Sequence, residues 1–320
     1  MPSFPATCTF TLGVLTSLFV FGRVASFAQT AGPTGRVSAD LEAPVRIRPE
    51  FQIGLTYRFV TRTEIHLSLP NAGGKDVEIE QQARFDVGIP VGNERGVSIK
   101  ARTDRLAVLL RSAGHTVSFD SMKPEDQQTP LGQHLRSSLN RSVDISLDES
   151  MRITAVEEKG LAGTAPALAG LPQFGPDELK QLVASLPQGF PNDPVRAGDE
   201  WTLQGTQAVG EIGEMKFDVT YRHGGIVLFE DNTCFEITFS GKLSGDVQLP
   251  EGVETNLTGN KMNFEGTSLH GRILYDPLDR MVRSSEQTLT MLLDLPEFPG
   301  QKVPLEQLAT VRLLRIEPTP

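Results

Sequence analysis

The chain has 320 residues, of which 38% are hydrophobic and 22% are charged, and its formal net charge is -10. Such a composition is that of an ordinary globular protein with ample material for a sizeable core. The acidic balance argues against a nucleic-acid partner, because binding to a phosphate backbone needs clustered Lys and Arg.

Residues 1–28 predict a secretory signal. An apolar run extends from Phe10 to Phe21, and Ser26-Phe27-Ala28 supplies small residues at a cleavage position. The run is shorter than the roughly 20 residues needed to span a bilayer, so a cleaved signal is favoured over the alternative, an uncleaved membrane anchor. The sequence therefore predicts an exported protein, periplasmic or secreted, without a transmembrane span in its mature chain.

The chain contains two cysteines, Cys8 and Cys234. Cys8 would be removed with the signal, and the remaining thiol cannot form an internal disulfide, so the fold must rely on its hydrophobic core. Cys234 lies in a strand-like pattern, and no histidine motif supplies a catalytic partner. A structural thiol is therefore favoured over a nucleophile.

Residues 29–48 are rich in Gly, Pro, Thr and Ser, which predicts a flexible N-terminal arm. The first β-rich half is expected over residues 49–158. Its clearest strand lies at residues 77–89, where apolar side chains alternate with charged and polar ones, as in a strand with one dry and one wet face. Leucines four residues apart predict a short helix over 131–139, and a hairpin over 143–155 closes this half.

Residues 159–192 are expected to connect two halves of the chain and to contain a helix over residues 176–186. Pro176 suits the first turn, and the acidic residues that follow it favour the positive end of a helix dipole. An apolar stripe along this helix consists of Leu179, Leu182, Val183 and Leu186. Proline and glycine from Pro187 onward end the helix.

The second β-rich half is expected over residues 193–320. Alternating patterns resume at residues 215–221 and continue towards the C-terminus. Turns are predicted at His223-Gly224-Gly225 and at Asp276–Arg280, where a proline occupies its favoured corner.

The two halves begin alike, since Gly54 precedes Tyr57 by three residues and Gly198 precedes Trp201 by three. Each predicted strand has one apolar face, and leaving that face wet forfeits roughly 25 cal/mol per Å². Because two short helices cannot cover so much sheet, the sheets must curl or stack on themselves. The predicted fold class is mainly β with few helices: two similar antiparallel, curved-sheet or half-barrel halves with a short helix between them.

Several short motifs resemble those of a family of exported bacterial β-sheet proteins, a domain of unknown function. The motifs are Ser118-Phe119-Asp120-Ser121 before Lys123-Pro124, the Leu147-Asp148 turn, Gly198-Asp199-Glu200-Trp201 and Tyr275-Asp276-Pro277. This resemblance implies no activity. The two-half pattern is also loosely similar to periplasmic lipid carriers, whose curved antiparallel sheet wraps apolar cargo around a helix.

The sequence has no local motif for catalysis or metal binding. Its five histidines lack HxxxH or HxH spacing, and no GxSxG elbow, P-loop or dinucleotide fingerprint occurs. Acidic pairs such as Asp276 with Asp279 could bind Ca²⁺, but turn capping explains them better. Asp120 is likewise expected to cap the turn before Pro124. We therefore expect no catalytic residue, no metal and no cofactor.

The favoured hypothesis is a non-enzymatic exported protein that binds an apolar or amphipathic ligand, such as a lipid, between a curved sheet and the helix over residues 176–186. The candidate ligand-binding residues are Tyr57, Trp201, Leu179, Leu182 and Val183. Aromatic residues at strand starts, however, more often plug a core. The alternative is a structural or interaction module of the cell envelope, with a filled core and envelope proteins as partners. A hydrolase assembled from distant loops ranks third.

Overall fold

The structure is a computed structural model. It describes residues 43–69, 73–90, 95–112, 114–139, 142–159, 176–208, 213–248, 261–263, 265–294 and 300–319. The predicted signal (residues 1–28), residues 29–42 of the predicted arm and residues 160–175 of the predicted connector lie outside the described residues.

Most of the described chain is extended. The strands are β1 (Leu55–Leu69), β2 (Gly73–Gly88), β3 (Val97–Ser112), β4 (His115–Asp120), β5 (Ser142–Leu147), β6 (Ile153–Lys159), β7 (Glu200–Ala208), β8 (Gly213–Phe229), β9 (Asn232–Gln248), β10 (Lys261–Asn263), β11 (Glu265–Asp276), β12 (Met281–Asp294) and β13 (Lys302–Pro318). The helices are a 3-10 turn, η1 (Asp126–Gln128), and two α-helices, α2 (Pro130–Leu139) and α3 (Pro176–Ser185). Both predicted helices are confirmed.

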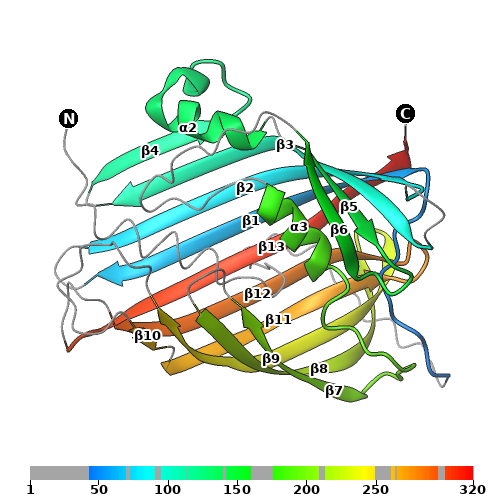
Figure 1. Cartoon of the computed structure of the whole chain (residues 1–320). Coiled ribbons are helices and arrows are strands. Elements are labelled where there is room, and N and C mark those ends of the chain that lie inside the picture. The colour runs from blue at the N-terminus through cyan, green and yellow to red at the C-terminus, as the bar shows by residue number, and fades with distance from the viewer. Residues whose placement is uncertain are drawn as a thin grey trace.

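The 13 strands belong to a single antiparallel sheet. Its order is β6-β5-β3-β2-β1-β13-β12-β11-β9-β8-β7, while β4 pairs with β3 and β10 pairs with β9. Figure 1 shows the long strands side by side across the molecule. Within the described residues the sheet stays open, because β6 and β7 at its two ends each pair on one side only. The predicted mainly β, antiparallel fold class is confirmed.

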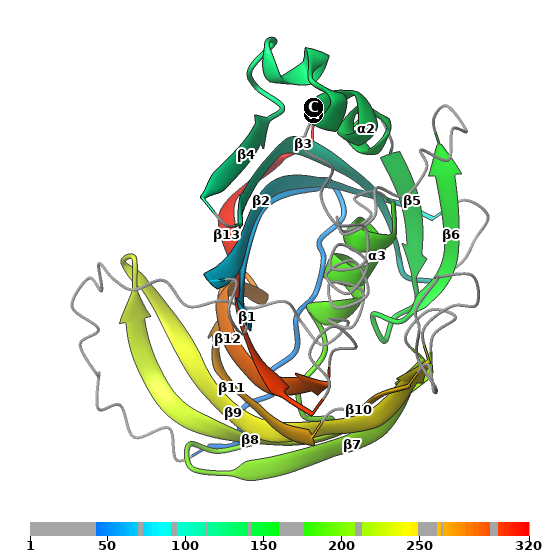
Figure 2. The same ribbon diagram turned by 90° about the vertical axis from the view of Figure 1, so that its left-hand side faces the viewer.

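The sheet is strongly curved. Figure 2 shows its strands winding around a concave side on which α3 lies. This helix packs against β3, β5 and β6, whereas α2 packs against β3 and η1 at the margin of the sheet. The described helices are too few to cover the apolar face of the sheet. The sheet buries this face by bending around it.

The two predicted halves share this one sheet. The C-terminal strand β13 pairs with β1 on one side and with β12 on the other. In that register Ala309 lies opposite both Thr63 and Gln287. Without β13, the facing sides of β1 and β12 would be unpaired edges, which proteins avoid exposing.

The turn predicted at His223-Gly224-Gly225 is wrong, because β8 continues through these residues to Phe229. The two glycines accommodate a β-bulge instead, with Gly225 at a φ of 106°. The chain reverses at Glu230 and Asp231, whose φ angles are 49° and 67°. Two consecutive residues with positive φ form the tight hairpin turn whose twist suits antiparallel strands.

The end of the predicted flexible arm is attached to the sheet instead of being loose. Val45 and Val195 exchange two backbone hydrogen bonds of 2.8 and 2.9 Å. Ile47 is fully buried, and the Tyr275 hydroxyl donates to the Arg48 carbonyl oxygen at 2.8 Å. In the sequence, the alternating apolar residues Val45 and Ile47 indicate that this stretch packs against the core. The polar residues around them led to the prediction of a flexible arm.

Candidate functional site

The concave face of the sheet is the candidate site. On the adjacent strands β3, β2, β1, β13 and β12, alternate side chains point to this face. These side chains form three successive groups along the strands, here called layers. Their borders run obliquely across the sheet, because Val311 lies opposite Thr61 and Gln307 lies opposite Ile65. The two outer layers are apolar and the middle one is polar.

The first apolar layer, here called the Tyr57 layer, lies where β1 begins. Its largest buried members, from β1, β2, β3 and β13, are Tyr57, Phe59, Phe85, Ile99, Val311 and Leu313. The Phe51 ring meets the Tyr57 ring edge-on, with centroids 5.1 Å apart, and Phe59 lies 5.4 Å from Phe85. Aromatic rings thus fill this end of the concave face.

The second apolar layer, here called the Leu67 layer, lies where β1 ends. Its buried members are Ile65, Leu67, Val77, Ile79, Leu289, Met291, Val303 and Leu305. These side chains are aliphatic apart from the thioether of Met291. The concave face therefore offers flexible apolar surface at this end of the strands.

Between the two apolar layers lies a polar belt. Its members are Thr61, Thr63, Gln81, Thr103, Ser285, Gln287 and Gln307. All are buried except Thr103, which is half-buried, and none carries an ionisable group. Because an amide or hydroxyl removed from water is costly unless it is hydrogen-bonded, a buried polar layer that crosses five strands calls for a chemical explanation.

Gln307 is the most deeply buried member of the belt. It lies between Ile65 of β1 and Leu289 of β12, and only 2% of its surface is exposed. Neither its Oε1 nor its Nε2 has a hydrogen-bond partner among the described residues. Gln81, in contrast, donates from Nε2 to the Thr103 hydroxyl at 2.7 Å. Gln307 therefore presents a free donor and a free acceptor to the concave side.

The belt was not among the predicted site residues, although its signal is present in the sequence. Gln81 occupies an apolar-parity position in the clearest predicted strand, between Ile79 and Ala83. Gln307 interrupts the apolar alternation of β13 between Leu305 and Ala309 in the same way. A polar residue on the dry side of a strand was the feature to look for.

Tyr57 and Trp201, both predicted as ligand-binding residues, lie in separate aromatic groups at the same end of the strands. The Tyr57 hydroxyl accepts the backbone N–H of Gln52 at 2.9 Å. Trp201 donates from Nε1 to the Gly189 carbonyl oxygen at 3.0 Å, and its ring stacks on Tyr221 with centroids 5.9 Å apart. The backbone thus occupies both polar groups, as expected for aromatic residues that plug a core.

The other predicted ligand-binding residues, Leu179, Leu182 and Val183, lie together on α3. All three side chains are buried. Since α3 packs against β3, β5 and β6, they face the first-half end of the sheet. The structure places them on the concave side in the same apolar cluster as Tyr57, and Trp201 packs against this cluster.

His223 is a buried titratable group on the concave side of β8. Its ring meets Phe235 edge-on, with centroids 5.4 Å apart. Burial lowers the pKa of His223, while the Arg196 backbone and the charge of Asp199 oppose this shift only in part. The imidazole is therefore neutral at physiological pH.

Cys234 lies on the convex side of β9, in a small apolar cluster with Val227 and Leu274. Burial raises the pKa of its thiol to about 12. Because only the thiolate is an effective nucleophile, Cys234 is unreactive at neutral pH. These surroundings agree with the predicted structural thiol.

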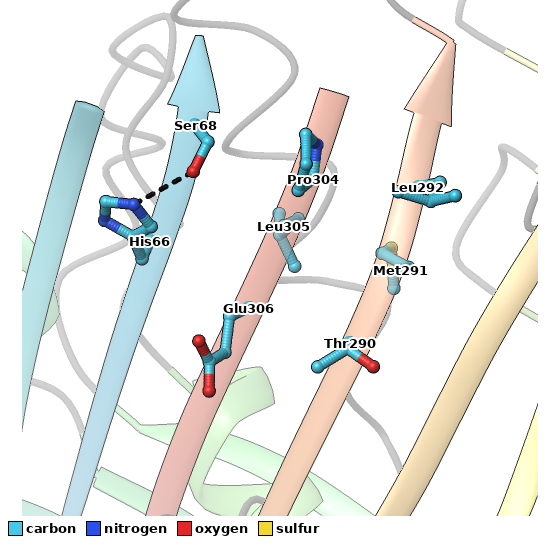
Figure 3. A pocket seen from close by; sticks show the side chains of 8 residues that line it. All are labelled: His66, Ser68, Thr290, Met291, Leu292, Pro304, Leu305 and Glu306. Atoms are coloured by element: carbon cyan, nitrogen blue, oxygen red, sulfur yellow. Dashed lines mark hydrogen bonds between the residues drawn. The ribbon is translucent and has the colours of Figure 1, made fainter. Parts of the chain in front are cut away.

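A shallow groove lies on the convex face, where β1, β13 and β12 run side by side (Figure 3). Its volume is ≈ 230 Å³. Its lining residues are His66, Ser68, Thr290, Met291, Leu292, Pro304, Leu305 and Glu306. Sequence analysis did not predict it, because its residues come from strands far apart in the chain.

Three side chains at this groove form a line of hydrogen bonds. His66 Nδ1 lies 2.6 Å from a carboxylate oxygen of Asp76, and His66 Nε2 lies 3.1 Å from the Ser68 hydroxyl. The order carboxylate, imidazole, hydroxyl is that of an activated serine nucleophile. However, the His66 and Asp76 side chains are 51% and 40% exposed, so water competes for these bonds.

Asp276, considered above for Ca²⁺ binding, and Asp120, expected to cap a turn, both make turn contacts. Asp276 Oδ1 accepts the backbone N–H of Leu278 at 2.8 Å. Asp120 accepts the Met122 N–H at 3.0 Å, and its hydrogen bonds with Arg105 lower the pKa of the Asp120 carboxyl. No cluster of three metal-ligating side chains occurs within the described part of the chain.

Comparison with known proteins defines no family. No protein-family model matches the chain, and no curated protein matches it. The chain is similar to a lipovitellin from a structure of "lipid-protein interactions in lipovitellin", with 14% identity and a TM-score of 0.42 over 85% of this chain and 26% of that one. It thus spans about a quarter of the lipovitellin chain.

Two further structures are more distant. An outer membrane channel from Pseudomonas putida F1 is 8% identical, with a TM-score of 0.22 over 87% of this chain and 100% of that one. OpdQ from Pseudomonas aeruginosa is 8% identical, with a TM-score of 0.17 over 82% of this chain and 99% of that one. Likenesses this low carry no argument about function. Among the described helices, none has the length and apolar character to cross a membrane.

Proposed function

We propose that this protein binds an apolar or amphipathic molecule on the concave face of its sheet and has no catalytic role. One observation carries the proposal: the apolar Tyr57 and Leu67 layers flank a buried polar belt across five adjacent strands. Ligand sites are typically concave and mainly apolar, with a few placed polar groups. The concave face has this composition.

The position of α3 supports the proposal. This helix packs against β3, β5 and β6, whereas β1, β13 and β12 of the polar belt lie further round the curve. In the proposed complex the ligand lies between this helix and the belt, with Leu179, Leu182 and Val183 on the helix side and Tyr57 and Trp201 towards one end. All five residues belong to, or pack against, one apolar cluster. Export to the periplasm or the medium is part of the proposal and is supported by the sequence of residues 1–28.

The proposal is tested by native mass spectrometry of the purified protein, followed by solvent extraction and titration of the delipidated chain with a fluorescent fatty acid. We expect an extractable apolar molecule and saturable binding of the probe. Ala309→Leu, which enlarges a side chain in the middle of the concave face, should weaken binding. The control Leu278→Trp, at a turn residue that is 85% exposed, should leave binding unchanged.

Circular dichroism of both variants shows whether the sheet is intact. A well-folded wild-type protein with no extractable lipid and no probe binding would contradict the proposed function.

The second candidate function is an interaction module of the cell envelope. The open edge at β6 favours it, because all but the first of its residues are exposed. An unpaired strand edge is a ready template for a strand from a partner. Recovery of an envelope protein on the wild-type chain, lost when a proline is placed at Glu157, would support this candidate over ligand binding.

A further inference from the structure

We propose that the preferred ligand is a neutral ester lipid with a free hydroxyl group, whose uncharged polar group lies at the polar belt. This inference rests on the proposed function and adds the class of ligand. The observation behind it is Gln307, a buried amide in the wall of an apolar surface, whose donor and acceptor have no partner in the described part of the chain.

The position of the belt sets the shape of the ligand. Along β1 the belt begins four residues after Tyr57, and strands rise by about 3.3 Å per residue, so roughly 13 Å of apolar wall lies on that side. On the other side the belt ends at Gln307, which lies opposite Ile65, and the four residues from Ile65 to Leu69 give roughly 13 Å of apolar wall. A molecule that matches this wall has its polar group between two apolar parts, not at one end.

The chemistry of the belt selects an uncharged group. All seven members carry amides or hydroxyls, and none is ionisable at neutral pH. A carboxylate or phosphate placed there would be a buried charge without a counter-ion, which is far more costly than a buried neutral dipole. This argues against a free fatty acid or a phospholipid whose head group lies at the belt.

Gln307 specifies which neutral group fits. Its Nε2 donates hydrogen bonds and suits an ester carbonyl oxygen, while its Oε1 accepts and suits a hydroxyl. A diacylglycerol offers both groups beside two acyl chains. A hydrocarbon offers neither and would leave the Gln307 amide unpaired, which costs affinity.

The test compares three competitors for displacement of a fluorescent diacylglycerol from the delipidated full-length chain: dioleoylglycerol, oleate at pH 8 and squalane. We expect dioleoylglycerol to compete best. In Gln307→Leu, its affinity should fall about tenfold while the affinity for squalane is unchanged, because about one buried hydrogen-bond pair is lost. Gln204→Leu, the same change at an exposed glutamine of edge strand β7, is the control and should preserve both affinities.

Gln307→Met keeps an unbranched side chain of similar length and should behave like Gln307→Leu. Agreement between the two variants shows that the loss of affinity comes from the missing amide and not from altered packing. If the wild-type chain binds lipids but Gln307→Leu and Gln307→Met keep the same ratio of dioleoylglycerol to squalane affinity, the inference fails while the proposed function stands. Oleate competing as well as dioleoylglycerol would also overturn it. If the wild-type chain binds no lipid, the proposed function fails and this inference fails with it.

Discussion

At His223, the protonation of one buried imidazole is linked to folding. Burial lowers its pKa below the ordinary value of 6.5, so the unfolded chain takes up the proton more readily than the folded one. Stability rises with pH wherever the unfolded state binds more protons. This histidine therefore leaves stability unchanged well above pH 6.5 and reduces it as the pH falls from 6.5 towards the lowered pKa of the folded state.

We predict that protonation of His223 lowers the free energy of unfolding of the wild-type chain below pH 6.5. The slope due to this residue is at most about 1.4 kcal/mol per pH unit. His223→Phe, which keeps a ring against Phe235, should remove that slope. Urea unfolding of both proteins between pH 8 and pH 5 measures the difference. Parallel curves for the two proteins would show that His223 has an ordinary pKa.

At Ser68, hydrogen bonding to His66 does not by itself create a nucleophile. The pair lies on the convex face in contact with water, and catalysis of acyl transfer depends on preorganised donors in a water-excluded site. We predict that a fluorophosphonate probe does not label Ser68, as measured by peptide mass spectrometry. Labelling that disappears in His66→Ala and Asp76→Asn would contradict the absence of a catalytic role.

Several residue roles could be predicted from their sequence neighbours, because the partners are close in the chain. Asp120 caps the next turn and Cys234 lies in a strand, as expected. The line formed by His66, Asp76 and Ser68 could not be predicted, since it depends on which residues β1 and β2 place opposite each other. The role of Gln307 depends in the same way on its neighbours across two strand pairs.

At the scale of elements, strand and helix positions follow from periodicity, whereas turns depend on backbone geometry that the residue types conceal. The hairpin between β8 and β9 turns at Glu230 and Asp231, two residue types that do not by themselves indicate a positive φ. The glycines before this turn belong to strand β8. Glycine within a strand more often marks a bulge or a close approach than a turn.

Gly271 of β11 shows such a close approach. A Cβ at this position would overlap the Glu286 carbonyl oxygen of β12 and the Phe239 ring of β9. We predict that Gly271→Ala destabilises the protein by roughly 1–3 kcal/mol, because the strands must separate to admit the methyl group. Gly88→Ala is the matched control, since a Cβ there has no neighbour within 4 Å. Equal urea midpoints for the two variants would refute the overlap.

At the scale of the whole molecule, one-sided strands and scarce helix were enough to predict a curved antiparallel sheet. They could not predict that the two halves share it. The decisive pairing joins β1 to β13, whose partners Thr63 and Ala309 lie at opposite ends of the chain. Two apolar strand faces of this kind would be equally compatible with two separate sheets, and only the long-range register distinguishes these arrangements.

Because β13 joins the two halves, the molecule should unfold as one cooperative unit. Leu308 lies in the middle of β13, opposite Glu64 of β1 and Thr288 of β12. A proline there removes a backbone donor from a central strand and should cost about 3 kcal/mol or more. Leu308→Thr is the control, because it changes the same side chain and keeps the strand backbone.

The single tryptophan, Trp201, makes this prediction measurable, since it lies on β7 at the far edge of the sheet. In Leu308→Pro, Trp201 fluorescence and the far-UV circular dichroism of all strands should lose their native signals together, at a lower urea concentration than in wild type or Leu308→Thr. If Trp201 kept its native transition while half of the β signal was lost, β7 and β8 would be folding with their own half, and the sheet would not be one cooperative structure.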